Sequence, residues 1–172
     1  VVRARPMFEA HLQPKLPTEL GFYDLRLPDI MIDQARLAKE YGIFGFCFYY
    51  YRFGKRRLLE RPIDNFFSHG KPDIPFVFCW ANESWSRRWD GAEEEILISQ
   101  EYDDETFNGL INDLIVSFSD SRYYRIDDAP LFLIYQIDKL PSPKKNIEFI
   151  RNEMRKAGFG TINICAVQSW GL

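Results

Sequence analysis

The chain has 172 residues, 46% of them hydrophobic and 27% charged, which is the balance of a globular domain rather than of a disordered chain. Its formal net charge of −3 and its sequence pI near 5.5 argue against nucleic-acid binding. No apolar run approaches the length of a membrane-spanning helix, so we expect no transmembrane segment.

The cysteines and histidines do not form a metal-binding pattern. Cys47, Cys79 and Cys165 fall inside predicted strands, in neither a CxxC pair nor a Cys/His cluster, and such isolated thiols suit a reducing compartment. His11 and His69 are too few and too far apart in sequence for a metal site, and we predict neither a metal nor a cofactor. The start of the chain lacks the apolar segment of a signal peptide. We therefore predict a cytoplasmic protein, with at most a peripheral association with membranes.

Residues 1–27 are expected to form an irregular arm, because three prolines interrupt any regular element there. Helices and strands then alternate along the chain. Prolines mark the first turns of three helices, and an aspartate caps the fourth. In chain order, these helices begin at Pro28, Pro62, Asp103 or Asp104, and Pro143.

Four apolar runs are predicted to be strands covered on both faces, because their hydrophobic residues are continuous rather than alternating. A turn at residues 93–95 and a short strand at 96–98 are also expected. This alternation of strand and helix predicts an α/β fold with parallel strands joined by crossover helices. The four apolar runs are residues 43–50, 75–80, 131–135 and 161–167.

Two architectures fit this alternation. One is an open doubly wound sheet, but no glycine-rich phosphate loop follows any strand. The other is a (β/α)8 barrel (a TIM barrel), whose functional residues lie in the loops after the strands. Because a full barrel takes about 250 residues, we predict that residues 1–172 form a single incomplete barrel domain. Polar and aromatic residues do gather after the strands, at 49–52, 80–90, 136–138 and 168–170.

The segment from Cys79 to Gly91 is the most informative stretch of the chain. It contains three of the four tryptophans, together with an amide, two carboxylates and two arginines. Indole faces stack on the C–H faces of sugars, while fixed polar groups hydrogen-bond to the hydroxyls. The segment therefore predicts one wall of a carbohydrate site.

Glu83 is the candidate general acid or base, because glycosidic chemistry needs a carboxyl group near the anomeric carbon. Only one of Tyr49 and Tyr50 can face a barrel interior, since neighbouring side chains of a strand alternate. The candidate sugar-binding residues are Tyr49, Tyr50, Trp80, Asn82, Trp85, Trp89, Asp90 and Gln168.

Structural roles compete with binding at several of these positions. Glu83 alternatively forms an ion pair with Arg87 or Arg88 and holds the loop in shape. Trp80 ends a strand and fits the core equally well, and Asp90 beside a glycine fits a turn.

Seven segments carry a family resemblance. They read GFYDLR (21–26), YGIFGFC (41–47), RLLERP (57–62), CWANE (79–83), RRWDG (87–91), ILISQ (96–100) and AVQS (166–169). In this order they resemble the WbsX-type proteins of bacterial polysaccharide and lipopolysaccharide biosynthesis, over nearly the whole chain. Several long motifs in one order are far more specific than a single short pattern.

The resemblance implies a glycosyltransferase whose domain is similar to glycoside hydrolase family 99, the endo-α-mannosidase type, which is a (β/α)8 barrel. It also implies that the catalytic carboxylates belong to a Trp-Asn-Glu-Trp-type segment, which we expect to lie beyond Leu172. Three positions depart from the family pattern, with Tyr50 in place of His, Arg52 in place of Trp and Ser84 in place of Asn. Binding roles do not carry over at those three positions.

The expected function is that of a carbohydrate-active domain in lipopolysaccharide or polysaccharide biosynthesis. Its partner would be a glycan or lipid-linked sugar, with glycosyl transfer or hydrolysis at α-linked residues. The alternative is a non-catalytic glycan-binding module that lacks the carboxylate pair. A third alternative is a doubly wound domain that binds a protein partner. A closed or half-closed curved sheet would exclude it.

Overall fold

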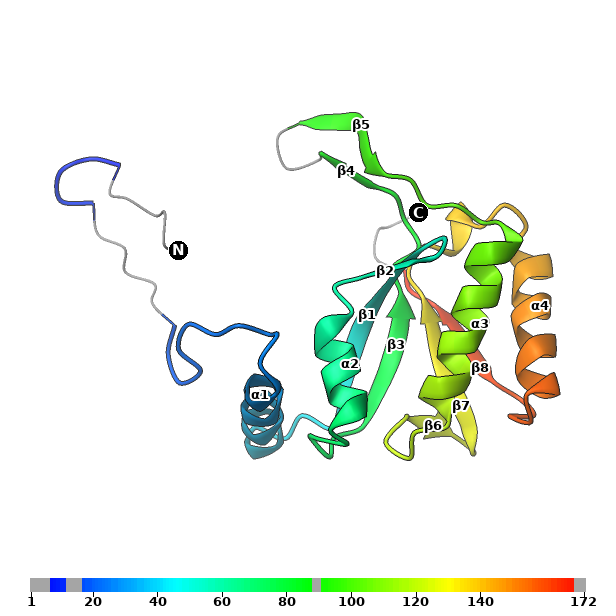
Figure 1. Cartoon of the computed structure of the whole chain (residues 1–172), viewed down its shortest axis with the longest axis horizontal. Coiled ribbons are helices and arrows are strands. Elements are labelled where there is room, and N and C mark those ends of the chain that lie inside the picture. Colours follow the sequence, from blue (N-terminus) through cyan, green and yellow to red (C-terminus); the bar gives the residue numbers. More distant parts are fainter. Residues whose placement is uncertain (1–6, 12–16, 88–90, 169–172) are drawn as a thin grey trace.

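A computed structural model describes residues 7–11, 17–87 and 91–168, and its centre is a mixed sheet (Figure 1). The strands follow the order β2-β1-β3-β7-β6, and β8 also pairs with β7. Short antiparallel strands, β2 (Arg56–Leu58) and β6 (Arg125–Ile126), pair with β1 and β7. The parallel strands are β1 (Phe46–Phe53), β3 (Phe76–Trp80), β7 (Ala129–Ile134) and β8 (Asn163–Ala166).

Helices connect the parallel strands, and α2, α3 and α4 lie on the same face of the sheet (Figure 1). The α1 helix packs beside α2. Three helices have proline in their first turn, and the Asp103 carboxylate caps α3 by accepting a hydrogen bond of 2.8 Å from the Thr106 backbone N–H. The helices are α1 (Pro28–Glu40), α2 (Arg61–Ser68), α3 (Asp104–Phe118), α4 (Pro143–Lys156) and the 3-10 turn η2 (Ile137–Lys139).

The predicted α/β fold with parallel strands and crossover helices is confirmed, but the described residues form an open sheet and no closed barrel. A tight turn joins β6 to β7, with Asp127 and Asp128 both at positive φ. Short side chains that hydrogen-bond locally make aspartate one of the residues that tolerate this conformation.

The short strand predicted at residues 96–98 is confirmed, whereas the turn predicted at 93–95 was wrong. Residues 93–95 are not a turn, because β5 runs continuously over Ala92–Ile98. The short strand does not join the parallel sheet either, since β5 pairs antiparallel with β4 (Trp85–Arg87) in a separate two-stranded sheet. The three consecutive glutamates of β5 suggested a turn. The strand forms instead because the backbone of the hairpin is paired, and the polarity of side chains does not predict that pairing.

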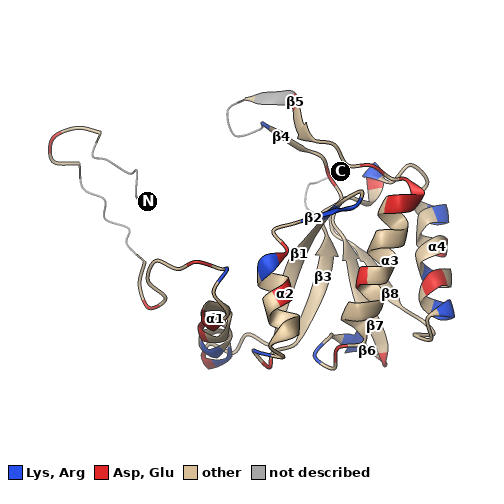
Figure 2. Cartoon of the chain, in the orientation of Figure 1, with Lys and Arg blue, Asp and Glu red and all other residues tan. Residues whose placement is uncertain are grey.

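The core lies between the sheet and its helices. Alternate strand residues point to that side, where Phe76, Phe78 and Trp80 of β3 are at most 1% exposed. The helices supply complementary rings, including Phe66 and Phe107, which meet the strand residues edge to face. In Figure 2 the parallel strands are almost entirely tan, while the charged residues lie mainly on the helices and turns. Burial of these rings is the main force that attaches the helices to the sheet.

The opposite face of the sheet, hereafter the open face, carries the other set of alternating residues. No described helix covers it, and Cys47, Tyr49 and Cys165 are exposed there. Cys79 on the same face is buried, and none of the three cysteines forms a disulfide. Two of the thiols are thus exposed, although all three were expected to be buried.

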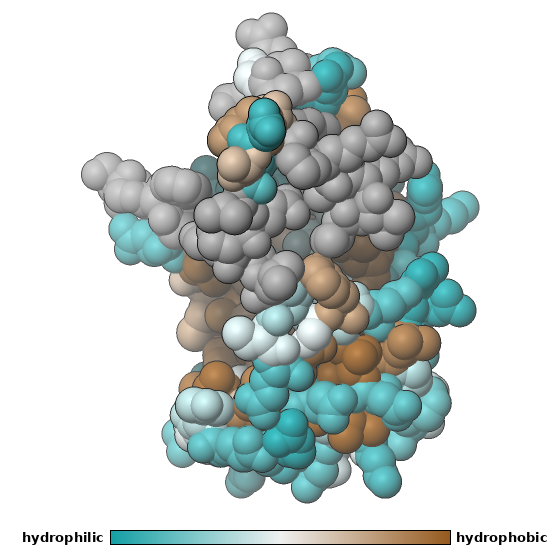
Figure 3. Space-filling model, turned by 90° about the vertical axis from the view of Figure 1, so that its left-hand side faces the viewer, coloured by the Kyte–Doolittle hydropathy of each residue, from teal (hydrophilic) through white to brown (hydrophobic). Residues whose placement is uncertain are grey.

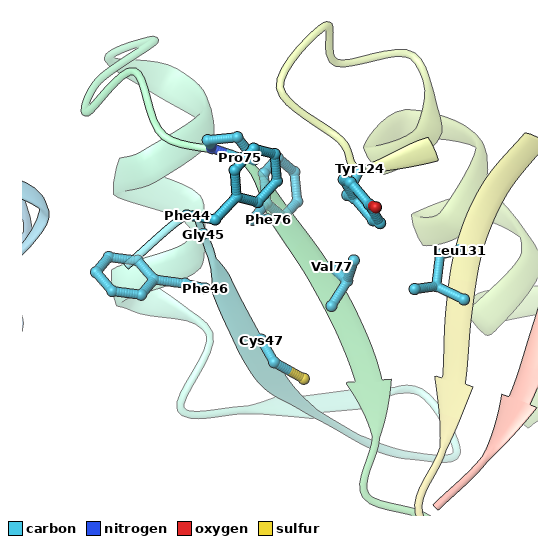
Figure 4. A pocket seen from close by; sticks show the side chains of 9 residues that line it. All are labelled: Phe44, Gly45, Phe46, Cys47, Pro75, Phe76, Val77, Tyr124 and Leu131. Atoms are coloured by element: carbon cyan, nitrogen blue, oxygen red, sulfur yellow. The ribbon is translucent and has the colours of Figure 1, made fainter. Parts of the chain in front are cut away.

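The amino-terminal end of the open face contains an apolar cavity of about 290 Å³ (Figure 4). Cys47, Val77 and Leu131 line it from neighbouring strands, and the rings of Phe44 and Tyr124 meet edge to face at its rim, 5.6 Å apart. Seen from the side, brown apolar surface also interrupts the teal hydrophilic surface (Figure 3). Because the lining of this cavity is nearly all apolar, it lacks the convergent polar groups of a sugar site.

Candidate functional site

Aromatic side chains gather at the opposite, carboxyl-terminal end of the open face. The ring centroids of Tyr49 and Tyr51 are 6.4 Å apart, those of Tyr49 and Tyr135 are 5.6 Å apart, and those of Tyr51 and Trp85 are 5.3 Å apart. We refer to these four residues as the ring cluster. Tyr49 is 49% exposed and the other three are half-buried, so the cluster presents ring surface to solvent.

The sheet brings the ring cluster together. Tyr49 and Tyr51 are two residues apart in β1, so both project from the same face. Tyr135 follows β7 and continues its pairing, since its backbone N–H donates to the carbonyl oxygen of Trp80 at 3.0 Å. Trp85 begins β4, where the hairpin leaves the sheet, and its ring also contacts Phe53 at 5.6 Å. Three segments that are far apart in sequence thus supply one aromatic surface.

Glu83 lies beside the ring cluster and is held by Gln136. The Gln136 Nε2 group donates a hydrogen bond of 2.7 Å to the Glu83 carboxylate, and the Glu83 side chain is half-buried. The pKa of Tyr51 is raised, chiefly by burial and then by the charge of Glu83, which places the carboxylate near that ring. This hydrogen bond occupies one carboxylate oxygen, and the other oxygen can accept from a ligand hydroxyl.

Asn82 joins the loop after β3 to the end of β7. Its Oδ1 accepts from the Gln136 backbone N–H at 2.8 Å, and its Nδ2 donates to the Gln136 carbonyl oxygen at 2.7 Å and to the Tyr102 hydroxyl at 3.3 Å. The Tyr102 hydroxyl in turn donates to the Asn82 carbonyl oxygen. Asn82 is fully buried, and both of its amide hydrogens are engaged. Asn82 thus acts as a structural clamp: it fixes the backbone of Gln136, whose side chain holds Glu83.

Tyr50 and Trp80 lie on the helix side of the sheet, away from the ring cluster. The Tyr50 hydroxyl hydrogen-bonds to Asp113 of α3, and burial, then the Asp113 charge, raises the pKa of Tyr50 well above its usual range. Trp80 is fully buried, with its ring edge to face against Tyr102 and Phe107. Trp80 is thus a core residue, which was the alternative to sugar binding. Of Tyr49 and Tyr50, it is Tyr49 that lies on the open face.

The remaining candidates are spread out. Trp89 and Asp90 lie outside the described residues. Gln168 is exposed two residues after β8. Arg87 and Arg88 were the predicted ion-pair partners of Glu83. Arg87 forms an ion pair with Glu95 across the hairpin, at 2.8 Å, and Arg88 lies outside the described residues.

Tyr51, Tyr135 and Gln136 were not among the predicted site residues. The signal for Tyr51 was its spacing of two from Tyr49, which puts both on one strand face. The signal for Tyr135 and Gln136 was their place directly after an apolar strand. Which of these loops meets Glu83 depends on strand order, which the sequence does not display.

Neither a metal cluster nor a membrane helix is found in the described part of the chain. No group of three histidine, cysteine, aspartate or glutamate side chains is placed to hold a metal ion there. Within the same residues, no helix combines the length and the apolar character needed to cross a bilayer.

These features define an α/β domain with an aromatic and acidic site at the carboxyl ends of its parallel strands. The chain belongs to the family described as Glycosyltransferase WbsX, whose model matches residues 1–171. This membership places the chain among glycosyltransferase-family domains.

Curated relatives are similar over the whole chain. It is 44% identical, over 170 residues, to the uncharacterized protein WxcX of Xanthomonas campestris pv. campestris strain B100 and to that of strain ATCC 33913. The match covers 99% of this chain but 24% of each relative, so the chain spans about a quarter of their length. No solved structure matches the chain significantly.

Proposed function

We propose that the chain is a carbohydrate-active domain whose sugar site is the ring cluster together with Glu83. The observation that carries the proposal is the meeting of Tyr49, Tyr51, Tyr135 and Trp85 with a carboxylate held by Gln136. Rings of this kind stack on the C–H faces of a sugar, and the carboxylate accepts hydrogen bonds from its hydroxyls. The family description, that of a glycosyltransferase, supports a role in building glycans, and we propose that the glycan is a bacterial polysaccharide or lipopolysaccharide.

We also propose that the parallel strands are a sector of a (β/α)8 barrel. Two observations support this architecture over a doubly wound sheet. The spatial order β1-β3-β7-β8 follows the chain without reversal, and α2, α3 and α4 cover one face only. A doubly wound sheet reverses its strand order so that helices cover both faces. In the barrel arrangement the open face lines the interior, and the ring cluster occupies the end where barrel enzymes bind substrate.

The proposed chemistry is glycosyl transfer or hydrolysis at an α-linked sugar. Both reactions need a group that exchanges a proton with the oxygen of the glycosidic bond. Glu83 is the proposed donor or acceptor of that proton, because the Gln136 amide fixes its carboxylate beside the rings. Tyr49 and Trp85 are proposed to hold the sugar ring.

Calorimetric titration of the purified protein tests the site. The probes are methyl α-glycosides of mannose, glucose and rhamnose, with their α-linked di- and trisaccharides. We expect Tyr49→Ala and Trp85→Ala to weaken binding by at least about tenfold, since each removes a stacking ring. The matched control is Tyr41→Ala, because Tyr41 is 78% exposed and lies at the end of α1, outside the ring cluster. Absence of binding to every probe, or equal losses in all three variants, contradicts the proposal.

The second candidate function is a glycan-binding module without turnover. It is favoured by one observation: in the described residues, a single carboxylate, that of Glu83, is held by a hydrogen bond beside the ring cluster, whereas glycosidases use two carboxylates. An assay in which chromatography monitors the formation of products from a trisaccharide distinguishes the enzyme from the binding module. Turnover that Glu83→Gln lowers by about 100-fold, with binding retained, supports the enzyme. Binding without turnover in the unmodified protein supports the module.

A further inference from the structure

A second, polar cavity of about 280 Å³ is lined by Glu83, the carboxylate beside the ring cluster. We refer to it as the polar notch. It lies between the β4–β5 hairpin and η2, and none of the three ring-cluster tyrosines lines it. Its volume is just below the range of about 300–1,000 Å³ typical of drug-sized ligands, which suits one sugar ring rather than several. Its lining residues are Glu83, Ser84, Ser86, Ile96, Gln100, Tyr102 and Lys139.

The polar notch contains hydrogen-bonding capacity that the folded chain does not use. Gln100 is only 7% exposed, and its Nε2 donates to the Glu101 carbonyl oxygen at 2.8 Å. Its Oε1, by contrast, is buried without a hydrogen-bond partner. Ser84 Oγ accepts from the Gln100 backbone N–H at 2.9 Å, which leaves the Ser84 hydroxyl hydrogen free to be donated. An unpaired buried acceptor is energetically costly, so a ligand hydroxyl that pairs with it is favoured.

Glu83 connects the polar notch with the ring cluster. Its carboxylate raises the pKa of Tyr51 in the ring cluster and, after burial and together with Asp138, that of Tyr102 in the wall of the notch. Glu83 also lines the notch itself, and it stands two residues before Trp85 of the ring cluster. The hydrogen bond from Gln136 holds it there.

We propose that the ring cluster and the polar notch are adjacent subsites for two linked sugars, and that Glu83 faces the oxygen that joins them. This inference rests on the proposed function and deepens it, because it defines the substrate class as a disaccharide or longer glycan with an internal linkage. The sugar on the ring cluster is held by stacking. The sugar in the notch is held by hydrogen bonds to Ser84, Gln100 and Lys139.

Titrating the protein with sugars of increasing length tests the two subsites. The probes are methyl α-mannoside, α-linked mannobiose and α-linked mannotriose, with the glucose and rhamnose series in parallel. We expect affinity to rise by at least about tenfold from the monosaccharide to the disaccharide, because the second sugar gains a second set of contacts. A smaller gain is expected for the third sugar.

Two substitutions at Ser86 locate the second sugar. Ser86→Leu places a larger apolar side chain against the notch and should abolish the gain from the second sugar without weakening the monosaccharide. Ser86→Ala leaves the notch open and should preserve the gain. Urea unfolding of both variants verifies that they are folded.

Three results overturn the inference. The first is equal affinity for the monosaccharide and the disaccharide in every series, which leaves the proposed sugar site intact but removes the second subsite. The second is a Ser86→Leu variant that loses monosaccharide and disaccharide binding in equal measure. The third is absence of binding to any probe, which rejects the proposed function together with this inference.

Discussion

Asn82 and Gln136 form a reciprocal pair of hydrogen bonds, in which a side-chain amide binds both backbone groups of a residue 54 positions away. The amide thus continues the pairing of β3 with β7 past the last strand residues. Because Gln136 also holds Glu83, this pair sets the position of the proposed acid.

Substitution of Asn82 by Ala should destabilise the protein and displace Glu83. It leaves the Gln136 backbone groups and the Tyr102 hydroxyl without their partner, at a cost of about 2–4 kcal/mol in the free energy of unfolding. Urea denaturation followed by circular dichroism measures the change. The control is Asn108→Ala on the exposed side of α3, which should shift stability by less than about 0.5 kcal/mol. Equal stability of the two variants contradicts the clamp.

Substitution by Ala should affect two tryptophans of the same segment differently, one chiefly in stability and the other chiefly in sugar binding. Trp80 is fully buried, so Trp80→Ala should cost about 3–5 kcal/mol of unfolding free energy. Trp85 is half-buried at the ring cluster, so Trp85→Ala should cost about 1–2 kcal/mol and chiefly weaken sugar binding. Thermal unfolding and titration of both variants provide the comparison. A Trp80→Ala variant that is stable but cannot bind sugar would reverse these assignments.

Gly109 of α3 should resist substitution, although it lies within a helix. Alanine normally stabilises a helix by about 0.5–1 kcal/mol relative to glycine. Here an added Cβ would lie 2.7 Å from Cζ of Arg52, whose buried guanidinium is held by Asp113, Tyr50 and the Gly54 carbonyl oxygen. We therefore expect Gly109→Ala to lower the free energy of unfolding.

A double-mutant cycle separates this steric effect from helix propensity. In an Arg52→Ala background the obstacle is absent, so Gly109→Ala should become stabilising by about 0.5–1 kcal/mol. Urea denaturation of the four proteins gives the coupling free energy. Additive effects of the two substitutions would show that Arg52 does not restrict Gly109.

Stability should fall at alkaline pH because of buried tyrosines. Burial raises the pKa of Tyr123 and, with the charge of Asp113, that of Tyr50, above the ordinary value of 10.0. The folded state then holds these protons more tightly than the unfolded state. Their contribution is complete below the unfolded-state pKa near pH 10 and is lost as pH rises toward the folded-state pKa.

Urea midpoints between pH 9 and pH 11 measure this loss, which is about 1.4 kcal/mol per pH unit for each tyrosine above the unfolded-state pKa. Tyr123→Phe removes the hydrogen bond of 2.8 Å to the Leu131 carbonyl oxygen, so it lowers stability at neutral pH. It should also reduce the slope of unfolding free energy against alkaline pH by the contribution of one proton. Exposed Tyr41 is the control, because Tyr41→Phe should leave the slope unchanged. A slope that is identical in all three proteins rejects the explanation.

The local elements follow from the sequence because their signals are short-range. Proline in the first turn and the Asp103 cap predicted the helix starts, and continuous apolar runs predicted the parallel strands. The same signals misjudged residues 93–95, where a run of glutamates lies within β5 of the hairpin and not in a turn. Backbone pairing of that kind has no side-chain signature.

The sequence by itself determined an α/β domain of the WbsX family, an aromatic-rich segment after β3, and Glu83 as a carboxylate within it. Tertiary structure alone decided which aromatic residues belong together. The alternation of β1 sends Tyr50 to the helices and Tyr49 to the open face, and the order of the strands brings Tyr135 and Gln136 to Glu83. The physical reason is that strand order and sheet face depend on which apolar surfaces the helices bury, a property of the whole core and of no single motif.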